Sequence, residues 1–150
     1  MSRKVRIRFS RGGEVVVTLL EREAPQTCDW IWKHLPLTAE VLHSRWCGRE
    51  INWPVKGQGL LPVENQTITT CTGALVYWRD WEGDPARASL ALYYGPELLT
   101  DHRGYLPVNA FGQVDTAQWP MLIEVGERIW QYGKELVSVS RVAEGEEEVA

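Results

Sequence analysis

The chain has 150 residues and a net charge of −4, and 44% of its residues are hydrophobic and 24% charged. This length suits one domain with a buried core, and the composition is ordinary for a globular protein. An overall acidic chain is a poor ligand for nucleic acids, and no apolar run in the sequence approaches the length of a membrane-spanning helix. We therefore expect a single domain over residues 1–143, a disordered acidic tail over residues 144–150, and neither a nucleic-acid nor a membrane partner.

The cysteine and tryptophan content limits the chemistry further. Cys28, Cys47 and Cys71 form no CxxC pair, and their odd number does not fit a disulfide framework or a zinc site. Free thiols are typical of a reducing compartment, and the first residues lack the apolar core of a signal peptide, so we expect a cytoplasmic protein. The eight tryptophans are expected in the core and in an interface of a homo-oligomer, or, for one or two of them, in a ligand cleft.

The first third of the chain predicts a β-hairpin followed by a helix. Residues 5–9 and 15–20 are strand-like, and the alternation of basic with apolar residues places Lys4, Arg6 and Arg8 on a solvated strand face. A helix should begin at Pro25 and stop before Pro36, because proline suits a first helical turn and disfavours helix in the residue before it. Its apolar stripe consists of Cys28, Ile31, Trp32 and Leu35.

The rest of the chain predicts more short strands and one further helix. The strand-like segments are residues 39–46, 49–55, 73–78, 88–94, 108–114 and 136–142, and loops are expected at 56–65, 79–87 and 95–107. The second helix begins near Pro120 and ends at Gly133, with Leu122, Val125, Gly126 and Ile129 on one face. Many short strands with two helices predict a mainly β protein with a closed barrel, because closure removes the exposed edges of a sheet.

Several of these segments resemble a known family. Val15-x-Val17-x-Leu19 with Ala24-Pro25-x-Thr27, and Ala110-Phe111-Gly112-Gln113-Val114 with the helix after it, look like the two strand–helix units of cyclophilins. A bacterial cyclophilin-like family of unknown function is closer still, with elements similar to Ile31-Trp32-x-x-Leu35-Pro36, His43-x-Arg45-Trp46-x-Gly48, Gly73-x-Leu75-x-Tyr77-Trp78 and Tyr94-Gly95. The resemblance covers residues 5–142 and implies a cyclophilin-like closed β-barrel capped by two α-helices.

The resemblance does not extend to the isomerase site. Cyclophilins use a histidine three residues before the Phe of Phe-Gly, where this chain has Val108, and an arginine in a Phe-His-Arg motif. Here that motif is altered to His43-Ser44-Arg45, and Gly57-Gln58-Gly59 lacks the expected residues before its glutamine. We therefore expect a module that binds a small, anionic metabolite rather than an isomerase. A prolyl isomerase with a degenerate site and a structural subunit of a larger enzyme are the alternatives.

Cofactor and metal motifs fail on inspection, so no cofactor and no metal are expected. Gly57-x-Gly59 has Pro62 at the third glycine position of a dinucleotide fingerprint. Asp80-x-Glu82-x-Asp84 resembles a calcium loop, but Ala91 stands where the bidentate glutamate is needed.

The segment from His43 to Trp53 is the best candidate for a site. Strand alternation places His43, Arg45 and Cys47 on one face, and a partly buried Arg45 needs a carboxylate. That carboxylate is either Glu50 or a ligand held in a cleft between Arg45, Trp53, Tyr94 and Asn109. Cys47 as a nucleophile lacks an evident base. His43, His102 and Gln113 are further candidates, with His102 either a general base or a solvated loop residue.

Overall fold

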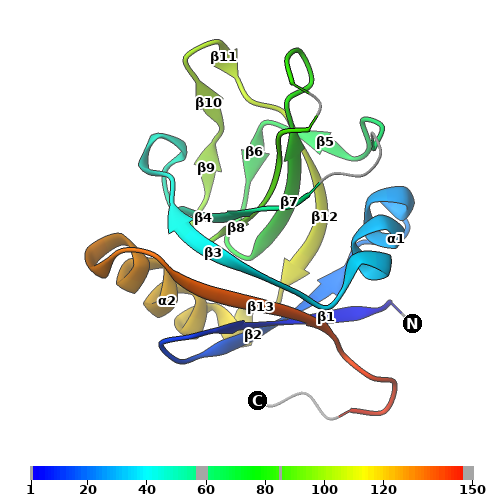
Figure 1. Cartoon of the computed structure of the whole chain (residues 1–150), viewed down its shortest axis with the longest axis vertical. Coiled ribbons are helices and arrows are strands. Elements are labelled where there is room, and N and C mark those ends of the chain that lie inside the picture. Colours follow the sequence, from blue (N-terminus) through cyan, green and yellow to red (C-terminus); the bar gives the residue numbers. More distant parts are fainter. Residues whose placement is uncertain (1, 57–60, 85, 147–150) are drawn as a thin grey trace.

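The chain forms a closed antiparallel β-barrel in a computed structural model that describes residues 2–56, 61–84 and 86–146 (Figure 1). Around the barrel the order is β2 (Glu14–Leu19), β1 (Lys4–Phe9), β13 (Glu135–Arg141), β3 (Leu37–His43), β4 (Glu50–Pro54), β8 (Ala88–Tyr93), β7 (Ala74–Arg79) and β12 (Val108–Val114). β12 pairs with β2, which closes the ring. The expected closed barrel is thus confirmed.

Five short strands lie in addition to the eight strands of the barrel in the described part of the chain. β5 (Gln66–Thr67) pairs with β12, β6 (Thr69–Thr70) with β9 (Glu97–Leu98), and β10 (Thr100–Asp101) with β11 (Gly104–Tyr105). The segment 95–107, predicted as a loop, therefore contains three strands, whose pairs are too short to show a periodic pattern in the sequence. In Figure 1 these strands project from the barrel beside β4 and β8.

The strand predicted over residues 39–46 ends early. β3 stops at His43, and Arg45–Cys47 form a 3₁₀ turn, η1, in which Cys47 N donates to Ser44 O at 3.1 Å. Gly48 leaves the turn with a φ of +82°, a conformation that favours glycine. The predicted alternation of His43, Arg45 and Cys47 on one strand face was therefore wrong.

The two helices, α1 (Pro25–His34) and α2 (Trp119–Tyr132), begin and end where the prolines and Gly133 predict. In α1 the stripe buries Cys28, Ile31 and Leu35, whereas Trp32 is only partly buried under the guanidinium groups of Arg3 and Arg141. Leu122, Val125, Gly126 and Ile129 of α2 are buried, as expected. No helix in the described part of the chain is long and apolar enough to cross a membrane.

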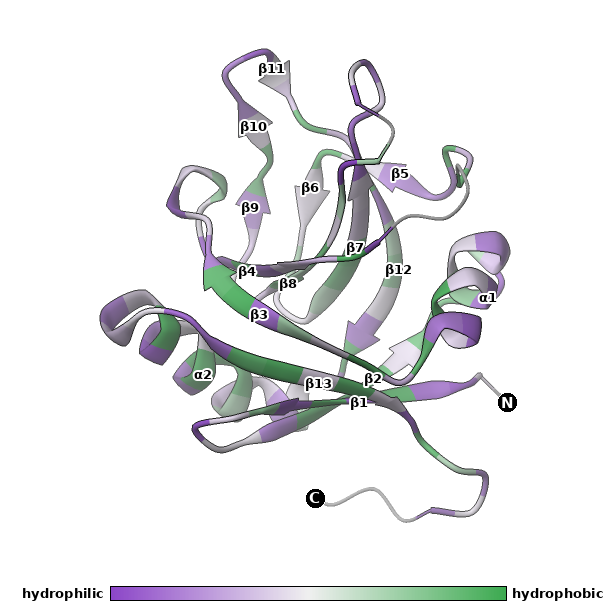
Figure 2. Cartoon of the chain, in the orientation of Figure 1, coloured by the Kyte–Doolittle hydropathy of each residue, from purple (hydrophilic) through white to green (hydrophobic). Residues whose placement is uncertain are grey.

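One apolar core fills the barrel, and both helices contribute to it. Inward side chains of the strands, such as Ile51, Trp53 and Leu92, pack in the same cluster as Ile31 of α1 and Val125 of α2. Figure 2 shows hydrophobic residues along the barrel strands and hydrophilic residues on parts of both helices and in the projecting strands. Because successive side chains of a strand alternate between its faces, the residues between these core positions point out of the barrel.

The basic N-terminal strand is less exposed than expected. Arg6 is only 7% exposed, and its Nε lies 2.7 Å from Glu14 Oε2 while its Nη1 lies 3.1 Å from Glu146 Oε2. The hairpin places Glu14 directly opposite Arg8, next to Arg6, so the solvated face predicted for Arg6 was wrong. Glu146 lies in the segment predicted as a tail, of which residues 147–150 are outside the described part of the chain.

A buried carboxylate ties α2 to the hairpin and to β13. The side chain of Glu135 is 1% exposed and accepts hydrogen bonds from Arg128 Nη2 at 2.7 Å and from Arg11 Nε at 2.8 Å. Arg128 Nη2 also donates to Gly12 O at 2.8 Å. Burial alone would raise the pKa of Glu135, but Arg128 and Arg11 outweigh it and hold the pKa below its usual value.

We predict that Glu135→Gln lowers the free energy of unfolding at pH 7 by roughly 2–3 kcal/mol, because two arginines lose a charged acceptor. Because the pKa of Glu135 is lower in the folded protein, its ionised carboxylate stabilises the fold at pH values above the pKa of the unfolded chain. That stability is lost as the pH falls through the pKa of the folded protein. Urea unfolding at pH 7 and at about pH 3 measures the difference, which should shrink in acid. Glu124→Gln, on the exposed face of α2, is the matched control. An equal effect of both variants would contradict the assignment.

Candidate functional site

The outer face of β4, β8 and β7 forms the floor of a cleft. Along β4, Ile51 and Trp53 point into the core, whereas Glu50 and Asn52 point outward and line the cleft. Ala91 and Tyr93 of β8 and Val76 of β7 continue the floor. Because successive side chains alternate between the two faces of a strand, these strands also have a packed face on the outside of the barrel.

The projecting segment 95–107 covers part of this outer face. A second apolar cluster joins floor residues to it and consists of Ala74, Val76, Ala91, Tyr93, Leu99 and Val108. Between the floor, η1 and the projecting strands remains a cavity of about 880 Å³. Trp46, Trp78 and Leu106 add apolar surface to its walls.

Glu50 is the most unusual residue of the cleft. It is 7% exposed, and its Oε2 atom has no hydrogen-bond partner among the described residues. Burial raises the pKa of the Glu50 carboxyl to about 7, and hydrogen bonds from the Cys47 thiol and the Tyr93 hydroxyl only partly counter this. Near neutral pH the carboxyl is therefore divided between its protonated and its ionised form.

The neighbours of Glu50 are themselves weak acids. Burial raises the pKa of Cys47 and of Tyr93, and the charge of Glu50 raises both further. Cys47 Sγ also lies 3.8 Å from Thr100 O. A thiol with a raised pKa stays protonated at neutral pH and is a poor nucleophile. Cys28, Cys47 and Cys71 are all free thiols.

The charged groups of the cleft differ in whether they have partners. Arg103 Nη1 lies 3.2 Å from Asp80 Oδ1, and Arg103 Nη2 lies 3.1 Å from Asp101 Oδ2, so Arg103 is engaged by two carboxylates. Lys56 and Arg87 are exposed and line the cleft, and neither forms an ion pair with another described residue; the Arg87 guanidinium lies 5.6 Å from the ring centre of Trp78. The part of the chain that the structure describes contains no cluster of three or more metal-ligating side chains.

Arg45 lies away from this cleft. It is exposed in η1, its guanidinium lies 4.0 Å from the ring centre of Trp130 on α2, and its Nη2 donates to Trp130 O at 3.2 Å. Arg45 therefore pairs with an aromatic ring of α2 rather than with Glu50. The turn that ends β3 is the reason, since it sends Arg45 to one side and Ser44 and Cys47 to the other.

His43 and Tyr94 form a separate pair under α2. His43 Nε2 lies 2.5 Å from the Tyr94 hydroxyl, and the ring of Trp130 meets the His43 ring edge-on at 4.7 Å. Burial, with a smaller effect of Arg45, lowers the pKa of His43. Gly126 gives the Tyr94 ring its place, because a side chain there would overlap the ring.

The remaining predicted site residues are dispersed. Trp53 lies in the barrel core, and Asn109 is buried, with Nδ2 donating to Pro62 O at 2.9 Å and to Thr27 Oγ1 at 3.2 Å. Gln113 Nε2 donates to Thr72 O at 2.9 Å. His102 is exposed and lines the cleft. The structure thus brings together Glu50 and His102, while Gly57, Gln58 and Gly59 lie outside the described residues.

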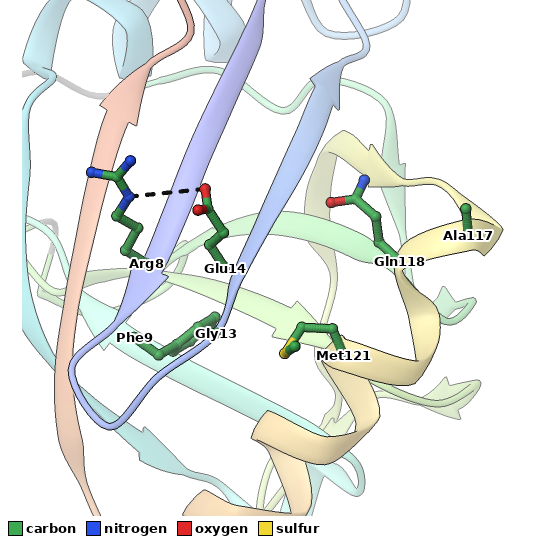
Figure 3. A pocket seen from close by; sticks show the side chains of 7 residues that line it. All are labelled: Arg8, Phe9, Gly13, Glu14, Ala117, Gln118 and Met121. Atoms are coloured by element: carbon green, nitrogen blue, oxygen red, sulfur yellow. Dashed lines mark ion pairs between the residues drawn. The ribbon is translucent and has the colours of Figure 1, made fainter. Parts of the chain in front are cut away.

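A second, smaller hollow of about 490 Å³ lies between the β1–β2 hairpin and α2 (Figure 3). Arg8 Nε lies 3.9 Å from Glu14 Oε2 there, and Arg6 pairs with the same carboxylate. The amide of Gln118 bonds to both backbone groups of Val16. Its charged groups are paired within the protein, so we take the larger cleft as the candidate site.

Sequence reasoning missed Tyr93, Trp78, Asn52 and Arg87 as cleft residues. A signal for the floor is present, because β7 and β8 are apolar at nearly every position and not at every second one. Such runs are typical of strands that are buried on both faces. This pattern indicates that something covers the outer face, although it does not say which segment does so.

Comparison with known protein families shows to which family the chain belongs. The model of DUF3830, described as a protein of unknown function, matches residues 9–141, so the chain belongs to that family. The comparison with curated proteins found no match.

Two solved structures share the barrel fold. One is the structure of McbB in complex with tryptophan, with a TM-score of 0.75 and 20% identity over 97% of this chain and 46% of that one. The chain therefore spans less than half the length of that protein. The other is the solution structure of the hypothetical protein AF2241 from Archaeoglobus fulgidus, with a TM-score of 0.58 and 23% identity over 94% of this chain and 95% of that one. Neither of the two is named as a cyclophilin, and that relationship stays a prediction.

We predict that Glu50→Gln makes the protein more stable at pH 8 than the natural chain. The pKa of Glu50 is about 7 in the folded protein and 4.5 in the unfolded chain. The folded protein therefore loses stability as the pH rises from 4.5 towards 7. The neutral amide avoids that loss. Urea unfolding at pH 8 and about pH 4 measures it, and the gain should shrink in acid. The exposed control Glu124→Gln should show no such pH-dependent gain, and a Glu50→Gln variant that is less stable at both values would contradict the prediction.

Proposed function

We propose that this member of the DUF3830 family binds a small organic molecule with an acidic group in the outer cleft. The observation that carries the proposal is the preformed cavity of about 880 Å³, whose lining combines apolar side chains with several polar and charged ones. Ligand sites typically occupy roughly 300–1,000 Å³, and their polar groups fix the orientation of the ligand. The protein is, in this proposal, a binding module.

Aromatic side chains support a flat, apolar part of the ligand. Trp46 in η1 lines the cleft and is 70% exposed. Trp78 of β7 also lines the cleft. Tryptophan is highly buried on average, so a ring this exposed offers apolar area that a ligand can cover. A planar ring of a ligand would cover part of both walls.

The exposed cations support the acidic group. Lys56 and Arg87 line the cleft without an ion pair to another described residue. The guanidinium of arginine matches a carboxylate in geometry and binds it with two hydrogen bonds. In this proposal Lys56 and Arg87 bind the acidic group of the ligand, as the sequence suggested for Arg45.

The molecule bound to one structural neighbour suggests a practical probe. McbB was solved with tryptophan, which combines an indole ring, a carboxylate and an amine. At 20% identity this likeness supports the fold alone, so tryptophan serves as a test compound for this cleft and not as its assigned ligand.

We predict that tryptophan shifts the NMR signals of the Asn52 side-chain amide and the Trp78 indole N–H, which line the cleft. Ser89→Trp should abolish these shifts, because Ser89 lies on the cleft wall and a large ring there fills the space. Ser138→Trp, on the exposed face of β13, is the matched control and should leave them unchanged. Shifts that persist in Ser89→Trp, or that map to the hollow of Figure 3, would contradict the proposal.

A cyclophilin-like relationship remains part of the proposal for the fold. The closed barrel with two helices supports it. The cleft contains Val108 and Ser44, while Arg45 lies outside it, which supports binding over prolyl isomerisation. Free thiols support the expected cytoplasmic location.

Self-association is proposed on a separate surface. Trp130 and Tyr132 at the end of α2 and Leu136 at the start of β13 are 42%, 72% and 51% exposed. Exposed apolar groups of this kind are typical of protein interfaces. A likeness to only 46% of a larger protein also leaves a role as a subunit as the alternative.

We predict that the protein is a dimer in light scattering after size-exclusion chromatography, and that Tyr132→Glu shifts it towards the monomer. The added charge would be buried without a partner in an interface of two copies. Glu82→Gln, exposed in the loop after β7, should leave the mass unchanged. A monomeric natural chain would contradict the proposal.

A further inference from the structure

We infer that the ligand of the outer cleft carries a protonated amine, and that Glu50 is the counter-ion that binds it. The inference rests on the proposed function, since it assigns a chemical group to the ligand of the same cleft. It concerns the floor of the cleft, whereas the proposal above concerns its exposed cations and aromatic walls.

An acid without a compensating cation among the described residues is buried at the floor of the cleft. Glu50 is 7% exposed at the cleft floor, and its Oε2 atom has no partner among the described residues. A buried carboxylate without a partner is costly, so such a group is normally paired with a cation, bound to a metal or kept protonated. The described residues contain no cluster that could hold a metal ion, and a cationic ligand is the partner that this geometry suits when the carboxyl is ionised.

Arginines beside Glu50 in the chain and in the cleft are paired with other groups, and Lys56 and Arg87, which form no ion pair with another described residue, are exposed. Arg103 binds both Asp80 and Asp101, and Arg49 Nε binds Glu97 Oε1 at 2.7 Å. Arg45 lies on the ring of Trp130. The groups that do face Glu50, the Cys47 thiol and the Tyr93 hydroxyl, are neutral donors. They leave the negative charge of the carboxylate uncompensated.

Negative and positive charge lie at different places in the cleft. The carboxylate lies at the buried floor, and the cations Lys56 and Arg87 are exposed. A molecule with an amine at one point and a carboxylate at another would meet both. The cleft thus suits an amino-acid-like zwitterion with an apolar, planar side chain.

The experiment compares three probes that differ by one group each. Tryptophan and indole-3-propionate share the indole and the carboxylate and differ in the amine, while tryptamine keeps the amine and lacks the carboxylate. We expect calorimetry at pH 8 to show tryptophan binding about tenfold more tightly than indole-3-propionate, as for a charge-assisted hydrogen bond. Glu50→Gln should remove this difference in affinity. It should also weaken the binding of tryptamine by about the same factor of ten, because tryptamine carries the same amine. The control Glu124→Gln, with the same change in net charge, should retain it.

A pH series separates the counter-ion from a protonated acid. An amine binds the ionised form of Glu50, so the affinity for tryptophan should rise between pH 6 and pH 8, around the Glu50 pKa of about 7. The other titratable groups of the cleft are Cys47, Lys56, Arg87, Tyr93, Asp101, His102 and Arg103. The rise should disappear in Glu50→Gln; if it persists there, one of these groups causes it and the inference is wrong.

The possible failures are distinct. If indole-3-propionate binds as tightly as tryptophan and Ser89→Trp blocks both, the cleft binds a ligand and the amine inference alone is overturned. If indole-3-propionate binds more tightly and its affinity falls as the pH rises, Glu50 is instead a protonated donor to an acid, which also overturns the inference. If none of the three probes binds to the natural chain, the proposed function and the inference both fail.

Discussion

The pairing of β12 with β2 is the constraint on which the rest of the structure depends. Gly112 lies opposite Leu19 of β2 and Leu75 of β7, at an irregularity in the β12–β7 register. A Cβ atom at Gly112 would lie 2.6 Å from Val17 Cγ1, closer than real side chains approach. Glycine therefore lets three strands meet where the ring closes, and an irregularity of this kind bends a strand as closure requires.

Closure divides every strand into an inner and an outer set of side chains. The inner set forms the core with both helices, and the outer set faces water unless another segment covers it. On β4, β8 and β7 the segment 95–107 provides that cover, but it leaves an open cavity above Glu50. The candidate site is thus a consequence of an incomplete second layer on the outside of the barrel.

The sequence predicted the parts of the fold that depend on periodicity and terminal residues. The barrel strands and both helices follow from alternation, from the prolines at helix starts and from Gly133. The site was harder, because Arg45 was placed by extending the strand alternation past His43. The turn at Arg45–Cys47 depends on Gly48 and on which segments pack nearby, and that information is not local. Glu50 was considered for a reason the structure does not support, since it was one of the two partners expected for Arg45, the other being a ligand.

Two buried glutamates show how environment, and not residue type, separates structure from a candidate function. Glu135 is enclosed by Arg128 and Arg11, and its pKa is lowered, so its charge stabilises the folded chain near neutral pH. Glu50 is as deeply buried, but only neutral donors face it and its pKa is raised, so its charge opposes folding. In a cleft of ligand size, the cationic partner that Glu50 lacks among the described residues is one that a bound molecule can supply.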